Sequence, residues 1–219
     1  MKFDVDQVLS HLKNRESTAA TLTIPFETGC IEQMLLGTFE IVVKRNRCEV
    51  IPSQEVAKAV SEIARSLTQP KREFGVMLRG SYGNGKTTLA KAVQTMLGML
   101  NLQTGYDNHS LRIAMKGADE LAALSAKSPT EFERLLDYDV VIIDDMGKEP
   151  EKMMDFGTIS RPIARMLAHR YRKRLYTVVT TNLTDSDILR RYGGDIADRI
   201  AEMLLPVTFS APSFRRHIS

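Results

Sequence analysis

The sequence contains little cysteine, which excludes two classes of stabilised site. Its two cysteines, Cys30 and Cys48, belong to no C-x-x-C pair and have no histidine cluster near them. A structural zinc site needs about four such ligands, and a disulfide framework needs several cysteine pairs. We therefore expect neither, and we expect both thiols to be buried or half-buried.

Long apolar runs, a secretion signal, internal repeats and low-complexity tracts are also missing. A membrane span needs about 18 or more consecutive apolar residues, and residues 1–10 lack the basic start and apolar centre of a secretion signal. We therefore expect a cytoplasmic protein without a membrane partner. With 219 residues, of which 43% are hydrophobic and 26% charged, the chain can form one main core and a small appendage.

Positive charge is concentrated in the last part of the chain. The net charge is only +3, but residues 161–219 carry 11 Lys and Arg against 5 Asp and Glu. A concentrated positive field attracts a phosphate backbone, whereas Lys and Arg at helix ends are often only solvated. The basic run His169–Arg174, with Arg190 and Arg191, is our candidate for contacts with DNA phosphates, including those of single-stranded DNA. Solvated helix ends are the alternative.

One loop predicts a nucleotide ligand. Residues 80–87 match the G-x-x-x-x-G-K-[ST] pattern, with a short apolar segment before them and a helical pattern over residues 88–99 after them. This context favours a phosphate loop over a plain glycine-rich turn, because backbone N–H groups and a helix N-terminus then face one anion. We expect ATP and Mg²⁺, with Lys86 on the β- and γ-phosphates and Thr87 on the metal. The expected nucleotide contacts are Gly80, Ser81, Tyr82, Gly83, Asn84, Gly85, Lys86, Thr87 and Thr88.

Strand and helix patterns alternate around and beyond this loop. Apolar segments typical of strands lie at residues 75–79, 111–115, 139–144, 176–180 and 206–209. Helical spacing covers residues 118–124, 130–136, 161–174, 187–192 and 195–205. Such alternation is typical of a parallel sheet covered on both faces. We therefore predict an α/β fold with a five-stranded parallel sheet.

The first 70 residues are predicted to form a small helical region. Helical spacing appears at residues 4–13, 30–47 and 52–68. Residues 38–43 also fit a strand, and we predict the helix; residues 14–26 are rich in Ser and Thr, as linkers are. We place a domain boundary after residue 70, with the nucleotide-binding domain at residues 71–219.

Polar side chains follow two of the predicted strands. Asp144 and Asp145 follow the apolar run Val140–Ile143, and Asn182 follows the strand at residues 176–180. Parallel strands end at one edge of the sheet, where ligands of α/β proteins bind. Asp144 is the candidate to orient Mg²⁺, and Asp145 is the candidate base or aligner for the attacking water. Asn182 is expected near the γ-phosphate, although Asn-Leu-Thr-Asp also fits a helix start.

Together these motifs resemble the DnaC/IstB group of AAA+ ATPases. The resemblance covers about residues 74–216 and rests on Gly80–Thr87, Asp144–Gly147, Thr180–Leu183, Tyr192–Ile200 and Ser213–Arg215. It implies a P-loop NTPase fold of AAA+ type without a C-terminal helical lid domain. It also implies that Asn182 is sensor 1, that Arg199 is the arginine finger toward a neighbouring subunit's ATP, and that Arg215 is similar to sensor 2.

Two of these positions have a second interpretation. Arg199 lies among Asp195, Asp198 and Glu202, so it also fits a surface ion pair. Asp145 stands where many AAA+ proteins have Glu, which implies slow hydrolysis.

The resemblance implies a function in DNA replication, because this group contains replicative helicase loaders. We expect an ATPase that couples ATP binding and hydrolysis to self-assembly on DNA with a replicative helicase, residues 1–70 being the partner-binding region. An Arg199 that acts in trans implies an ATP-dependent homo-oligomer. The alternatives are an IstB-like transposition ATPase with a transposase as partner, a small-molecule P-loop kinase, and an ATP-gated adaptor that does not hydrolyse. The adenine pocket is expected near residues 50–74 and the chain end.

Overall fold

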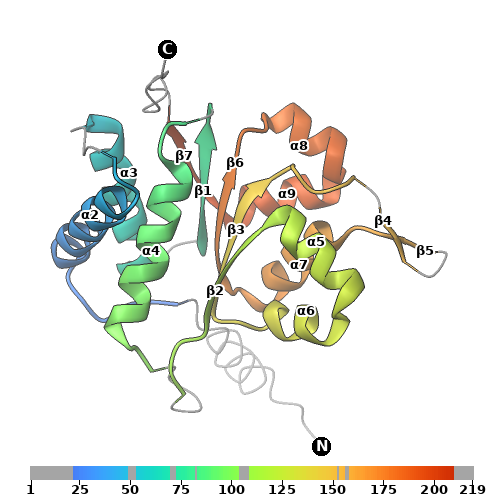
Figure 1. Cartoon of the computed structure of the whole chain (residues 1–219), viewed down its shortest axis with the longest axis horizontal. Helices are drawn as coiled ribbons and strands as arrows, with labels where there is room; N and C mark the ends of the chain where they lie inside the picture. The colour runs from blue at the N-terminus through green and yellow to red at the C-terminus, as the bar shows by residue number, and fades with distance from the viewer. Residues whose placement is uncertain are drawn as a thin grey trace, which may run out of the picture.

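A five-stranded parallel sheet forms the centre of the molecule (Figure 1). The computed structural model describes residues 22–48, 53–69, 73–81, 83–103, 109–151, 153–155 and 158–209. The strands are β1 (Gly75–Gly80), β2 (Ile113–Gly117), β3 (Val140–Met146), β6 (Tyr176–Thr181) and β7 (Leu205–Phe209). Their spatial order is β2-β3-β6-β1-β7, and every neighbouring pair is parallel, so the predicted sheet is confirmed.

Helices cover both faces of the sheet, as predicted (Figure 1). One face carries α2 (Thr28–Arg45), α3 (Gln54–Thr68) and α4 (Lys86–Leu100). The other carries α5 (Ala118–Lys127), α6 (Pro129–Leu136), α7 (Pro162–Lys173), α8 (Asp185–Tyr192) and α9 (Gly194–Met203). Within the described ranges, none of these helices is long and apolar enough to cross a membrane.

Strand residues alternate between two hydrophobic cores. Val140 and Ile142 of β3 belong to the core with α2, α3 and α4, whereas Val141 and Ile143 belong to the core with α5 to α9. This alternation follows from the period of two in a strand. Burial on both faces explains why β3 reads as a continuous apolar run.

The N-terminal helices pack directly against the sheet. Residues 38–43 form part of α2, so the helix prediction is confirmed over the strand alternative. Ser53 caps α3 by accepting a hydrogen bond from the Val56 N–H. In the core, Ser66 of α3 and Tyr176 of β6 share a buried hydrogen bond of 2.5 Å. The described part of the N-terminal region therefore shares a core with the sheet; the helix predicted at residues 4–13 lies outside the described residues.

The fold differs from the predicted pattern in a short hairpin, at the start of α8, and in β2, which spans Ile113–Gly117 rather than residues 111–115. A short hairpin of β4 (Met153–Asp155) and β5 (Thr158–Ser160) follows β3 and was not predicted. Helix α8 begins at residue 185 rather than 187, because Thr184 caps it: its hydroxyl accepts from the Asp187 N–H at 3.2 Å, and the Asp187 carboxylate accepts from the Thr184 N–H at 3.1 Å. The capping residue therefore lies further upstream than the apolar spacing indicated.

Both cysteines are exposed, so the expectation of buried or half-buried thiols is wrong. In α2 the core-facing positions belong to the apolar residues Ile31, Leu35 and Phe39, and Cys30 lies one residue away from that stripe. Cys48 follows the end of α2. Helical geometry thus directs the Cys30 side chain to solvent.

Candidate nucleotide-binding site

The phosphate loop begins where β1 ends and closes where α4 begins. Gly80, Gly83 and Gly85 have φ angles of 145°, 80° and 88°, in the region that favours glycine. A Cβ atom on Gly80 would lie 2.2 Å from the Phe209 carbonyl oxygen and 2.6 Å from Asn84 Nδ2. Only glycine fits at the junction between the strand and the loop. The backbone thus forms the curled cradle that a polyphosphate needs.

Lys86 lies inside this cradle and is buried. Its Nζ donates hydrogen bonds to the Gly80 carbonyl at 2.8 Å, the Ser81 carbonyl at 2.7 Å and Asn84 Oδ1 at 3.0 Å. Burial lowers the pKa of Lys86, and the nearby carboxylates of Asp145 and Asp144 oppose that shift. Asn84, buried as well, donates from Nδ2 to the Phe209 carbonyl at 3.3 Å. The loop is therefore fastened to both α4 and β7.

Thr87 and Asp144, the predicted magnesium residues, lie in contact. The Thr87 hydroxyl donates to Asp144 Oδ1 at 2.9 Å, and the Thr180 hydroxyl donates to the same oxygen at 2.6 Å. A threonine hydroxyl and a carboxylate side by side provide the hard oxygen ligands that Mg²⁺ prefers. Together with the glycine cradle beside Lys86, these two residues fit a magnesium-bound nucleotide.

Asp145 lies on an irregularity at the end of β3. The pairing of β3 with β6 shifts register between Ile143 and Met146, and the φ angle of Asp145 is +55°. The Asp145 N–H donates to the Thr180 hydroxyl at 2.8 Å, and its carboxylate pairs with Lys148 Nζ at 2.5 Å. The bulge thus gives the two neighbouring carboxylates different partners.

Asn182 lies directly after β6, as predicted. Its Oδ1 atom is buried and has no hydrogen-bond partner within the described part of the chain. A buried amide oxygen without a partner is costly, so such an atom indicates a place where a ligand or water binds.

Arg199 lies on α9, and its described contacts are with α9 itself and with α7. It donates to Asp195 Oδ1 at 3.1 Å and its guanidinium lies 5.6 Å from the centre of the Tyr171 ring. Its side chain is 28% exposed. The structure therefore brings Lys86, Thr87, Asp144 and Asp145 together, while the described contacts of Arg199 belong to α7 and α9. Tyr82 and Arg215 lie outside the described residues, Ser81 is exposed, and Thr88 is half-buried in the first turn of α4.

Comparisons with known proteins identify solved structures with a similar fold. No protein-family model matches the chain, and no curated protein matches it in sequence. Among solved structures, the DnaC helicase loader matches with a TM-score of 0.57 and 20% identity, over 74% of this chain and 94% of that one. DnaI matches with a TM-score of 0.58 and 21% identity, over 76% of this chain and 88% of that one. This chain has a DnaC-like fold.

The DnaC-like fold is also related to that of a replication initiator. DnaA bound to AMPPCP and single-stranded DNA matches with a TM-score of 0.50 and 14% identity, over 74% of this chain and 49% of that one. The predicted α/β fold with a five-stranded parallel sheet is therefore confirmed.

On this DnaC-like fold, the predicted basic run does not act as one surface. Arg170 is fully buried and donates to five oxygens, those of Leu136, Tyr138, Asp139, Tyr176 and the Thr177 hydroxyl. Burial lowers the pKa of Arg170 to about 9, the nearby carboxylates of Asp139 and Asp137 oppose that shift, and Arg170 stays protonated at neutral pH. The proposal that Arg170 contacts DNA is therefore wrong.

The Arg191 side chain is also mostly buried. Its side chain is 14% exposed and contacts Glu149 and Glu151. His169 and Lys173 both contact the carboxylate of Asp137 at 2.7 Å. Arg172, Lys173 and Arg190 are the exposed cations that remain from the predicted set.

Sequence reasoning missed several residues that shape the site in this DnaC-like fold. Thr180 belongs to a predicted strand and to the motif Thr180–Leu183 but has no predicted role of its own, yet its hydroxyl bridges Asp144 and Asp145. Arg79, directly before the phosphate loop, donates to both carboxylate oxygens of Asp185 in α8. The arginine in an otherwise apolar strand was the available signal, because a cation there requires a partner.

Proposed function

We propose that this protein is a cytoplasmic, ATP-dependent replication protein of the helicase-loader type. ATP binding and slow hydrolysis would control its self-assembly on DNA together with a replicative helicase. The observation that carries this proposal is the cluster of Lys86, Thr87, Asp144 and Asp145 at the sheet edge of a fold that spans 94% of the DnaC chain. The chemistry of these residues supports a role for each of them in nucleotide binding or hydrolysis.

The phosphate loop is proposed to hold the nucleotide. Lys86 would exchange its contacts with the Gly80 and Ser81 carbonyls for contacts with phosphate oxygens. Thr87 and Asp144 would hold Mg²⁺, which neutralises phosphate charge when bound. Because Asp144 already accepts from both Thr87 and Thr180, its oxygen is oriented before the nucleotide arrives.

Three residues are proposed to act on the γ-phosphate and the attacking water. Asp145 would orient or deprotonate the water, and the unpartnered Oδ1 atom of Asn182 would accept from it. Arg199 of a neighbouring subunit would supply positive charge in trans, which makes assembly a condition of hydrolysis.

DNA is the proposed surface for assembly. The exposed cations Arg172, Lys173 and Arg190 supply positive charge on the side of α7 and α8. The DnaA structure that matches this fold contains single-stranded DNA, which supports single-stranded DNA as the first ligand to test. An IstB-like transposition role, with a transposase as partner, is the competing function in the same fold.

A capture assay tests the proposal. A hexameric replicative helicase is immobilised, and wild type, Lys86→Met and Lys91→Met are applied with ATP, with ADP and without nucleotide. Lys91 is exposed on the same helix as Lys86, so Lys91→Met is the matched control. We expect ATP-dependent capture of wild type and control, reduced at least about tenfold in Lys86→Met because the lysine contacts the phosphates.

Three results would contradict the loader proposal. Capture without regard to nucleotide would remove the ATP dependence, and capture by a transposase instead of the helicase would favour the IstB-like function. Transfer of the ATP γ-phosphate to a small acceptor, without helicase capture, would favour a kinase.

A further inference from the structure

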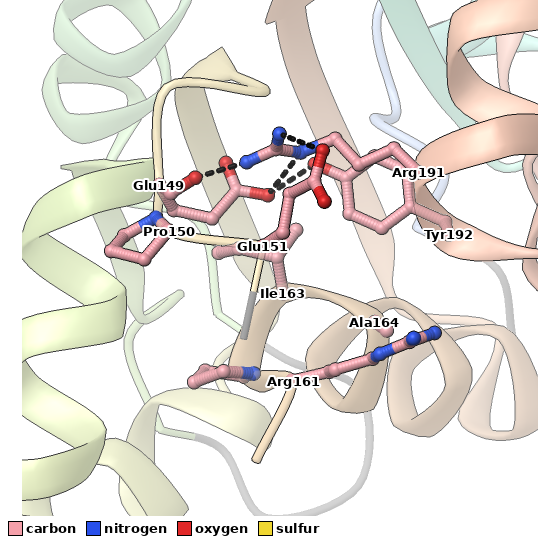
Figure 2. Close-up of a pocket in the computed structure, with 9 residues that line it drawn as sticks. Glu149, Pro150, Glu151, Arg161, Ile163, Ala164, Arg191 and Tyr192 are labelled. Carbon is pink, nitrogen blue, oxygen red and sulfur yellow. Dashed lines mark hydrogen bonds and ion pairs between the residues drawn. The ribbon is translucent and has the colours of Figure 1, made fainter. Parts of the chain in front are cut away.

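A buried carboxylate lies four residues beyond Asp145 and is not used by the proposed function. Glu149 is 5% exposed and follows the turn that leaves β3. Its Oε2 atom accepts from the Gly147 N–H at 2.8 Å, and its Oε1 atom accepts from Arg191 Nε at 3.3 Å. The Tyr192 hydroxyl donates to Oε1 as well, and Arg191 also donates to the Glu149 carbonyl. Figure 2 shows these side chains directed toward one another beside Pro150.

The segment between Asp145 and Glu149 has an unusual backbone that needs external support. Asp145 has a φ angle of +55°, which a residue with a side chain rarely adopts, and Gly147 has a φ angle of +107°. A Cβ atom on Gly147 would lie 2.8 Å from the Leu183 side chain. Such conformations persist where surrounding contacts over-determine them.

The supporting contacts come from two directions. On the side of the sheet, Thr180 holds the Asp145 N–H and the Thr181 hydroxyl holds the Met146 carbonyl at 2.7 Å. On the outer side, Glu149 holds the Gly147 N–H. Glu149 therefore fixes the far end of the segment that carries Asp145.

The partners of Glu149 lie on the helix that follows Asn182. Arg191 and Tyr192 are the last two residues of α8, and α9, which carries Arg199, begins at Gly194. Gly193 joins the two helices with a φ angle of +86°. Burial and the Glu149 carboxylate raise the pKa of the Tyr192 hydroxyl, which therefore stays a hydrogen-bond donor.

We propose that Glu149 is a positioning residue for Asp145. Through the Gly147 N–H, the Glu149 carboxylate holds Asp145 in its left-handed conformation beside Asp144, and Arg191 and Tyr192 of α8 hold Glu149. The proposal rests on the proposed ATPase function for its catalytic consequence. It predicts that the cluster affects turnover far more than nucleotide affinity, because Lys86 and Thr87 bind the phosphates independently of Glu149.

The experiment compares four variants with wild type. Glu149→Gln keeps the volume of the side chain but turns an amide N–H₂ toward one of its donors, and Arg191→Met removes the cation. The double variant Glu149→Gln/Arg191→Met completes a cycle that isolates their coupling. Arg165→Met is the matched control, because Arg165 is an exposed arginine of α7 that pairs with Glu133 on the surface.

Three measurements are made on the full chain. Hydrogen exchange of residues 144–149 reports the loop directly and requires no activity. Nucleotide affinity is measured by calorimetry, and the steady-state ATPase rate gives kcat and KM. In Glu149→Gln and Arg191→Met we expect faster exchange over this segment, a kcat lower by about ten- to hundredfold, and an ATP Kd within about twofold of wild type.

The outcomes separate this proposal from the one on which it rests. Exchange and kcat equal to those of Arg165→Met would overturn the positioning role, and so would additive effects in the double variant. A parallel loss of kcat and ATP affinity would reduce Glu149 to general structural support and overturn it also. A wild type without ATPase activity would contradict the proposed function, and the exchange data would still decide whether Glu149 holds the segment.

Discussion

The two proposed halves of the candidate site differ in how far contacts within one chain orient them. Lys86, Thr87 and Asp144 are held by hydrogen bonds of 2.6 to 3.0 Å from the loop, α4 and β6. Arg199 donates instead to Asp195 of its own helix and lies over Tyr171. The fold therefore orients the first half. The described contacts of Arg199, in contrast, are with α7 and α9.

This difference has an electrostatic consequence. The first half contains the buried ammonium of Lys86, the two carboxylates of Asp144 and Asp145, and the half-exposed ammonium of Lys148, which pairs with Asp145. A nucleoside triphosphate brings several negative charges to it, so further positive charge is required from Mg²⁺ and from an arginine. A site divided between two subunits would meet this requirement only after assembly.

The largest effect is expected from Asp144→Asn, which weakens the half that the fold builds. The amide keeps the size of the side chain but removes the charge proposed to hold Mg²⁺. We expect the Mg²⁺-dependent ATPase rate to fall by about 10²- to 10³-fold, as when a main electrostatic contact of a transition state is lost. Steady-state hydrolysis measures it, with Asp119→Asn, exposed in the first turn of α5, as the control. A wild-type rate in Asp144→Asn would remove Asp144 from the metal site.

A smaller effect is expected from Arg199→Ala, which tests the half that a neighbour is proposed to complete. We expect turnover to fall by about ten- to hundredfold at concentrations where wild type assembles. This loss is smaller than is usual on removal of an arginine finger, because Asp145 predicts a slow wild-type rate. ATP binding should be unchanged. Arg165→Ala, an exposed position on α7 that pairs with Glu133, is the control.

Mixing two inactive variants decides whether Arg199 acts in trans. Lys86→Met retains Arg199, and Arg199→Ala retains the phosphate loop, so a mixed assembly contains some complete sites. We expect the mixture to recover activity that neither variant has alone. A mixture as inactive as its components, with a wild-type rate per subunit that does not depend on protein concentration, would place the arginine in cis or outside the site.

The parts of the fold that the sequence predicted are those set by local chemistry. The run Val140–Ile143 is buried on both faces and reads as a strand without knowledge of its neighbours. Gly80 and Gly85 adopt φ angles that other residues avoid, so their positions in the sequence are sufficient to predict the phosphate loop. Thr87 and Asp144 are expected at the same magnesium site because parallel strands end at one edge of the sheet. The Thr87 hydroxyl is 2.9 Å from Asp144 Oδ1.

The parts that were not predicted depend on contacts between distant segments. Arg170 belongs to a basic run in the sequence, but its five acceptors come from the end of α6, the turn before β3, and β6. Glu149 and Arg191 are 42 residues apart, and neither belongs to a motif. A buried polar side chain looks like an exposed one in a sequence, because the partner that permits its burial is supplied by the tertiary fold.

The smallest effect is expected at the other end of α8, where Arg79 donates to both carboxylate oxygens of Asp185. Hydrogen bonds from Arg79 lower the pKa of Asp185 below 3.8. Since the folded-state pKa is the lower one, the stabilisation is full well above pH 3.8 and is lost as the pH falls through the folded-state value. The Asp185 side chain is 85% exposed, so we expect Asp185→Asn to cost only about 0.5 kcal/mol at pH 7.

Urea denaturation of wild type and Asp185→Asn between pH 7 and pH 3 measures this contribution, with Asp198→Asn as an exposed control. The difference in the free energy of unfolding should shrink toward the acidic end, and a difference that is constant with pH would mean that the ion pair does not contribute. Because Arg79 directly precedes the phosphate loop, a small value would mean that this ion pair couples α8 to the loop only weakly, and that burial of Ile188 and Tyr192 in the core is what holds the helix.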